Sequence, residues 1–143
     1  MIKHISEIEA LKFVKEQKHK NSWHDDFNKW RKHLIVLANT WPELKKFYKG
    51  KGKWLGYFDG EKLVGVYWYN IQGDDIYDGF LISSKVGAGI KLGRYLKTLI
   101  WKTNWSCCSF KYINFNKRLG FTVYGKTEIE EDEVFLLWRQ KRF

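Results

Sequence analysis

The chain has few residues that constrain a backbone covalently or sterically. Its 143 residues include one proline, one methionine and two cysteines. No apolar run approaches the ~20 residues that a membrane-spanning helix requires. Cys107 and Cys108 are adjacent, so they cannot close a long loop with a disulfide, and residues 1–4 lack the apolar core of a secretory signal. We therefore expect a cytoplasmic protein with reduced thiols.

The chain also lacks the common sequence signatures of catalysis and metal binding. It has no Ser-His-Asp order, no zinc-type spacing of cysteine and histidine, and no Walker loop. His24, Asp25 and Asp26 are metal-ligand residue types, but their spacing does not place all three on one face. We interpret them as the start of a helix, where acidic side chains are favoured by the helix dipole, and we expect no metal site.

Positive charge and aromatic side chains are abundant instead. The chain has 26 Lys and Arg against 16 Asp and Glu, for a net charge of +10, and 18% of its residues are aromatic. Such a charge favours an anionic partner, or serves solubility alone. The length predicts one domain over residues 1–143, large enough to bury a core without disulfides.

The hydrophobic periodicity predicts an α/β (α+β) chain. Residues 1–4 suit a short strand, and Ser6 with Glu9 forms a capping box for a helix whose apolar side would carry Ile8, Leu11 and Val14. A second helix should begin near Asp25, and a further helical turn should span residues 42–48. The remaining elements alternate as strands 54–58, 62–70 and 76–83, helix 89–101, strand 105–110, helix 111–119, and strands 121–127 and 134–139.

Residues 82–96 are glycine-rich and pass from a strand pattern to a helical one. Glycines allow close approach of a ligand to the backbone, and the free N–H groups of a first helical turn bind anions. A right-handed strand-helix-strand connection would place this turn at the carboxyl end of the sheet, where α/β sheets bind ligands. The predicted anion-binding residues are Gly87, Gly89, Lys91, Leu92, Gly93 and Arg94.

Residues 115–121 follow this helix and complete a recognisable pair of motifs. Together the two segments resemble the GNAT superfamily of N-acyltransferases, in which Arg/Gln-x-x-Gly-x-Gly/Ala opens the helix that holds the pyrophosphate of acetyl-CoA. Aligned on its last glycine, that pattern falls on Ala88, Lys91 and Gly93, and one of these three positions matches. The family's later aromatic-Tyr-x-Lys-x-Gly-Phe motif falls on Phe115, Asn116, Arg118, Gly120 and Phe121.

The resemblance implies a GNAT-like mixed, mostly antiparallel sheet of six or seven strands, flanked by about four helices. It implies transfer of an acyl group from acetyl-CoA, or another acyl-CoA, to an amine. Asp78, on the strand before the glycine turn, is the candidate base, unless it is only an exposed strand acid. Asn116 stands where many members have the tyrosine that protonates the departing thiolate, so Tyr112, one turn earlier, or solvent would replace it. The side chain of Lys91 either binds a phosphate or blocks the glycine-rich turn that would hold the pyrophosphate, which we call the cradle.

Five lysines lie between residues 45 and 53, interleaved with aromatic residues, a composition suited to nucleic-acid backbone and base stacking. They are Lys45, Lys46, Lys49, Lys51 and Lys53. They could equally be a solvated loop. The acceptor therefore stays open as a protein, a small molecule or a nucleobase. An alternative function is a GNAT-shaped binding protein that has lost its cofactor and engages nucleic acid or a protein, as an accessory protein of a phage or mobile element.

Overall fold

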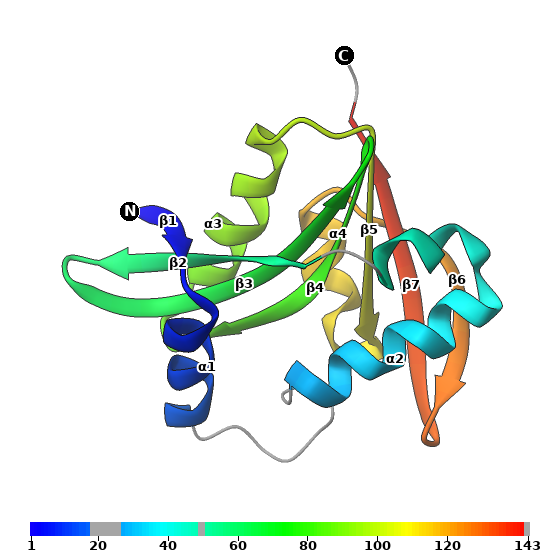
Figure 1. The fold of residues 1–143 in the computed structure, drawn as a ribbon, viewed down its shortest axis with the longest axis horizontal. Helices are drawn as coiled ribbons and strands as arrows, with labels where there is room; N and C mark the ends of the chain where they lie inside the picture. Colours follow the sequence, from blue (N-terminus) through cyan, green and yellow to red (C-terminus); the bar gives the residue numbers. More distant parts are fainter. Residues whose placement is uncertain (18–26, 49–50, 142–143) are drawn as a thin grey trace.

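The computed structural model describes residues 1–17, 27–48 and 51–141. Over these ranges seven strands form one sheet in the order β1-β2-β3-β4-β5-β7-β6 (Figure 1). Neighbouring strands are antiparallel except β4 and β5, which are parallel. The predicted mixed, mostly antiparallel sheet is thus confirmed. The strands are β1 (Ile2–Ile5), β2 (Lys53–Asp59), β3 (Lys62–Gln72), β4 (Asp75–Ser83), β5 (Thr103–Ser109), β6 (Thr122–Ile129) and β7 (Asp132–Gln140).

Helices cover both faces of the sheet (Figure 1). In the described ranges the α-helices are α1 (Glu7–Glu16), α2 (Phe27–Thr40), α3 (Ala88–Tyr95) and α4 (Ile113–Arg118). The 3₁₀ helices are η2 (Pro42–Tyr48), η3 (Leu96–Thr98) and η4 (Phe110–Tyr112). α1 and α2 pack on one face, and α3 and α4 on the other, so the core has a layer on each side of the sheet.

The period-two alternation of each strand divides its side chains between these layers. On β4, Tyr77 and Phe80 face the aromatic core under α2, whereas Ile76 faces α3. On β5, Cys107 faces α2 and Cys108 faces α4. Both faces of the central strands are therefore buried, which explains their nearly continuous apolar sequence.

Local signals placed the first elements correctly. The Ser6 hydroxyl accepts a hydrogen bond from the Glu9 amide at 3.1 Å, as the capping box predicts. The expected apolar side of α1 is only partly right: Leu11 and Val14 are half-buried and pack against the core, but Ile8 is 82% exposed, and the fully buried residues are Ala10 and Phe13. Short helices with several apolar residues leave the rotation about the axis to tertiary packing.

The helix predicted over residues 89–101 ends early. α3 stops at Tyr95, and η3 tightens its last turn. Trp101 lies beyond both, buried, and its indole N–H donates to the Leu96 carbonyl at 2.6 Å. Because this bond satisfies a terminal carbonyl of the helix, the chain can turn directly into β5.

The parallel ladder between β4 and β5 is short. It pairs Asp75 with Thr103 and ends with Tyr77 opposite Trp105, after which the two strands separate. β4 contains a bulge close to the end of this ladder. Trp68 of β3 pairs with Phe80 and Tyr69 pairs with Asp78, so Gly79 is an extra residue without a partner on β3. The sheet therefore splits between β4 and β5, and α3 begins beside the split.

Candidate active site

A cavity of about 500 Å³ occupies the separation of β4 and β5. One side is formed by β4 at Gly79 and Leu81, and the other by β5 from Ser106 to Ser109. The start of α3 and the inner surface of α4 line the α3/α4 side of the sheet. The gap left by the unpaired strand ends is thus a site with backbone groups on both walls.

The start of α3 lies on the rim of this cavity. Gly87 precedes the helix in the left-handed region, with φ of 88°, a conformation that glycine adopts without strain. A Cβ atom on Gly89 would lie 3.2 Å from Leu81 and 3.3 Å from Phe115, so the lack of a side chain lets the first turn approach both walls. Gly87 and Gly89, two of the predicted anion-binding residues, both line the cavity.

The sequence alignment of the glycine pattern on Gly93 is displaced from the helix start. Gly93 lies inside α3, where an added Cβ atom would come within 2.6 Å of Leu119, and its carbonyl accepts a hydrogen bond from Arg139 at 3.2 Å. It is a packing glycine. Because α3 begins at Ala88, the helix-opening pattern coincides instead with Ser84, Gly87 and Gly89, and two of its three positions hold glycine.

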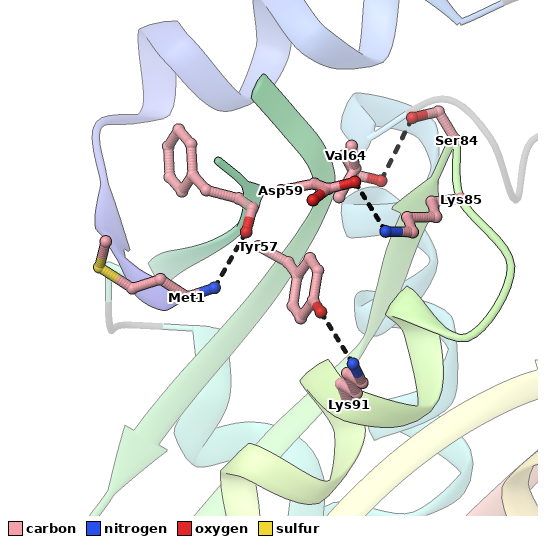
Figure 2. A network of polar contacts seen from close by, with 8 residues as sticks. Met1, Tyr57, Asp59, Val64, Ser84, Lys85 and Lys91 are labelled. Atoms are coloured by element: carbon pink, nitrogen blue, oxygen red, sulfur yellow. Dashed lines mark hydrogen bonds and ion pairs between the residues drawn. The ribbon is translucent and has the colours of Figure 1, made fainter. Parts of the chain in front are cut away.

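Lys91 points away from the cavity. Its Nζ donates to the Tyr57 hydroxyl at 3.0 Å and lies 5.4 Å from the centre of that ring (Figure 2). In this arrangement Lys91 is not among the residues that line the cavity. Within α3, Leu92 is fully buried and Arg94, in the last turn, is exposed. These residues, with Gly93, are the part of the predicted cradle that the structure leaves outside the cavity.

A second set of polar contacts joins the segment before α3 to β2 and β3. Lys85 Nζ lies 2.7 Å from Asp59 Oδ2, and the Ser84 hydroxyl donates to the Val64 carbonyl at 3.4 Å (Figure 2). The Ser84 amide donates to the same carbonyl at 2.9 Å. The hydrogen bond to Asp59 raises the pKa of Lys85 and lowers that of Asp59. Lys85 also lines the cavity, with its ammonium paired to the Asp59 carboxylate.

Asp78, the predicted base, is fully buried and held by neutral donors. The Tyr67 hydroxyl donates to Oδ1, and Asn104 Nδ2 donates to Oδ2 at 2.6 Å. Ser106 is a further hydrogen-bond partner. Burial raises the pKa of Asp78, opposed by its hydrogen bonds and by the charge of Arg139. The alternative of an exposed strand acid is wrong, and access from the cavity passes through Tyr67 or Ser106, which line it.

Arg139 anchors this buried network. Its Nη1 donates to the Leu119 carbonyl at 2.5 Å, beyond the end of α4. The guanidinium centre lies 4.5 Å from the Phe121 ring and 5.3 Å from the Trp101 ring. Burial lowers the pKa of Arg139, while the charge of Asp78 raises it. A single side chain thereby joins β7 to the segments around both cavity helices.

Tyr112, the candidate acid, and Asn116, which stands at the position of the family's tyrosine, both line the cavity. Tyr112 is 45% exposed at the junction of η4 and α4, so its hydroxyl is accessible to a ligand. Asn116 is buried, and its Nδ2 donates to the Tyr112 carbonyl at 2.9 Å. Asn116 is also hydrogen-bonded to Cys108, whose pKa is raised to about 12, chiefly by burial. The amide therefore holds the turn that carries Tyr112.

The five predicted lysines do not form one cluster in the described residues. Lys45 and Lys46 lie on η2, and Lys46 is paired with Asp75 at the start of β4. Lys51 and Lys53 lie at the start of β2, beside a second cavity that Arg31 and His4 also line. Lys49 lies outside the described residues.

Sequence reasoning missed several residues that line the cavity. The bulge at Gly79 has no sequence signal beyond a glycine within a strand. Ser106 and Trp30 come from segments assigned by periodicity to strand and helix interiors. Arg118 lines the cavity at the end of α4, and its place in the second family motif was the signal that could have identified it.

Across residues 1–17, 27–48 and 51–141, no group of three or more His, Cys, Asp or Glu side chains could hold a metal ion. In the same residues no helix is both long enough and apolar enough to cross a membrane.

The fold is that of known acetyltransferases. No family model and no curated protein sequence matches the chain. A GNAT-family acetyltransferase structure from Bacillus cereus is 15% identical, with a TM-score of 0.65 over 100% of this chain and 98% of that one. The Escherichia coli ribosomal-protein-S18-alanine N-acetyltransferase is 11% identical, with a TM-score of 0.65 over 98% and 92%. A Bacillus subtilis acetyltransferase in complex with CoA is 14% identical, with a TM-score of 0.55 over 99% and 98%. The chain therefore has the GNAT N-acyltransferase fold.

Proposed function

We propose that the protein is a CoA-dependent N-acyltransferase that moves an acetyl or other acyl group to an amine. The observation that carries this proposal is the cavity between the separated ends of β4 and β5, with the amino terminus of α3 on its rim. It supplies the two features that a CoA thioester needs: a slot through the sheet for an extended chain and backbone donors for phosphate.

The pyrophosphate would bind at the start of α3. Free amides of a first helical turn and the helix dipole stabilise anions. Gly87 and Gly89 line the cavity at this point, and Lys85 and Arg118 add positive charge on its two sides. Charge-assisted hydrogen bonds from such cations are about twice as strong as neutral ones.

The thioester would lie at the bulge of β4. The additional residue Gly79 disrupts the strand ladder there, so backbone amides can be directed at the thioester carbonyl as negative charge develops on its oxygen. The amine attacks the carbonyl carbon, the C–N bond forms, and the C–S bond breaks. Holding both reactants in line supplies much of the acceleration without covalent participation of the protein.

Two proton transfers complete the reaction. Asp78 does not contact the cavity directly, so a proton from the amine would pass through the Ser106 hydroxyl, which both lines the cavity and hydrogen-bonds to Asp78. Burial raises the pKa of Asp78, which makes its carboxylate a stronger base than an exposed one. The exposed Tyr112 hydroxyl would protonate the departing thiolate, and Asn116 would position it.

Calorimetric titration of CoA into the protein tests this proposal. We expect a dissociation constant in the micromolar range. Arg118→Glu reverses a charge at the cavity and should weaken CoA binding at least tenfold, whereas Lys117→Glu changes an exposed neighbour that does not line the cavity and should alter it less than threefold. Absence of heat and of thermal stabilisation at millimolar CoA would refute the proposal.

The acceptor can then be sought by CoA release from acetyl-CoA. A first panel follows the acceptors of other enzymes with this fold: a peptide with an amino-terminal alanine, spermidine and an aminoglycoside. Because the chain carries a net charge of +10, we also include acidic peptides and single-stranded oligonucleotides.

A further inference from the structure

Trp30 closes the far end of the cavity. It belongs to α2, on the opposite face of the sheet from α3 and α4, yet it lines the cavity and is only 3% exposed. A Cβ atom on Gly79 would lie 3.0 Å from its Cζ2 atom. The six-membered ring of Trp30 therefore lies against the β4 bulge, where the slot passes through the sheet.

The Trp30 ring is held on several sides. Its centre lies 5.8 Å from that of Tyr77, inclined at 32°, and it meets Trp68 edge to face at 5.4 Å. The indole hydrogen-bonds to Cys107, whose Sγ also accepts a hydrogen bond from the Tyr77 hydroxyl at 3.2 Å. A ring packed in this way cannot rotate without breaking its contacts with residues of β3, β4 and β5.

We propose that Trp30 is a specificity-determining residue that limits the acyl group to about the size of acetyl. The inference rests on the proposed function, because it assumes that the thioester lies at Gly79. From there the acyl group would extend toward the Trp30 ring, and a two-carbon group would end in contact with it. A longer chain would have to displace a packed aromatic ring, which costs binding energy.

The test is a calorimetric series with CoA, acetyl-CoA, butyryl-CoA and hexanoyl-CoA. We expect the wild-type protein to bind acetyl-CoA at least as tightly as CoA, and hexanoyl-CoA at least tenfold more weakly than acetyl-CoA. Trp30→Leu opens space beyond the bulge. Each methylene that then becomes buried should recover about fourfold in affinity, so the preference for acetyl-CoA over hexanoyl-CoA should fall below threefold or reverse.

Trp41→Leu is the matched control. Trp41 packs on β6, where a Cβ atom at Gly125 would lie 2.7 Å from its ring, and it does not line the cavity. This variant should keep the wild-type order of affinities. If Trp30→Leu lowers the melting temperature too far for titration, Trp30→Phe retains an aromatic ring and should shift the preference in the same direction by a smaller factor.

The outcomes separate the two proposals. If wild-type protein binds CoA but binds hexanoyl-CoA as tightly as acetyl-CoA, or if the folded Trp30 variants keep the wild-type preference, the acyl-length inference is wrong and the proposed function stands. If CoA itself does not bind, the proposed function fails, and the inference fails with it.

Discussion

Arg139 of β7 donates a hydrogen bond from Nε to Oδ1 of Asn104 in β5, at 2.8 Å. Asn104 in turn donates from Nδ2 to Asp78 of β4 at 2.6 Å. The chain of contacts crosses three adjacent strands at the level where the parallel ladder of β4 and β5 ends. The separation of the strands therefore begins at a buried polar junction that holds its edges in place.

Removing the cation from this junction should destabilise the fold. Arg139→Met leaves Asp78 buried without a counter-charge and deprives the Leu119 and Gly93 carbonyls of a donor. Each buried acceptor left without its donor typically costs about 1–3 kcal/mol, so we expect the free energy of unfolding, measured with urea, to fall by at least about 3 kcal/mol. Asp78→Asn with Arg139→Met should cost less than the sum of the single changes. A loss below about 1 kcal/mol for Arg139→Met would show that the junction is not ionic.

Alkaline pH should destabilise the protein through a buried thiol. Burial raises the pKa of Cys107 from 9.0 to about 11, so between these values the native thiol keeps a proton that the unfolded chain releases. The contribution is therefore constant below pH 9 and is lost as pH rises toward 11, by about 3 kcal/mol in all. Urea unfolding at pH 8 to 11 measures it. Cys107→Val removes the titrating group and should flatten the decline; an unchanged pH dependence would contradict this origin.

Gly93→Ala should act on stability and not on CoA. The added methyl would lie 2.6 Å from Leu119, and overpacking of this kind costs about 1–3 kcal/mol. In a Leu119→Ala background the clash is gone, so the same change should become neutral or slightly stabilising, because alanine favours helix. Thermal melts of the wild type, the two single variants and the double variant give the coupling energy between positions 93 and 119. If the Gly93→Ala protein is folded and its affinity for CoA falls more than tenfold, Gly93 belongs to the CoA-binding site after all.

Lys91→Gln should leave the affinity for CoA within about twofold of wild type, since Nζ is hydrogen-bonded to Tyr57 outside the cavity. Calorimetry with Tyr57→Phe in parallel checks the partner. Tenfold weaker binding by Lys91→Gln would mean that the ammonium leaves Tyr57 to hold a phosphate; tighter binding would mean that the side chain obstructs the cradle.

Salt dependence tests the nucleic-acid hypothesis for the lysines at positions 45, 46, 49, 51 and 53. If these bind duplex DNA, the logarithm of the association constant should fall with that of salt by about 0.9 per phosphate neutralised, or about 0.7 on single strands. Replacing the five with Gln should flatten the slope. Because Lys46 is paired with Asp75, its share should be the smallest. Binding that is absent, or insensitive to these changes, identifies a solvated loop.

Sequence alone determined the order of elements and their approximate bounds, because those follow from local patterns. The capping box at Ser6 and the helical spacing of Phe27 and Trp30 depend on residues close in the chain. The glycine-rich turn with Gly87 and Gly89 was likewise recognisable, since only glycine adopts its backbone geometry without strain.

Tertiary structure alone decided which of these residues share the cavity. Gly89 and Gly93 both lie in the glycine-rich segment, and their roles differ because Leu119 packs against Gly93 whereas Gly89 lines the cavity. Asp78 is a residue type expected of a base, but it is buried next to the cavity and does not line it. Hydrogen bonds from Tyr67 and Asn104, which are distant in the chain, hold it there. Trp30 looked like an ordinary core residue of a helix, and it reaches the cavity because β4 and β5 separate beneath it. Such contacts join segments far apart in sequence, so no local pattern encodes them.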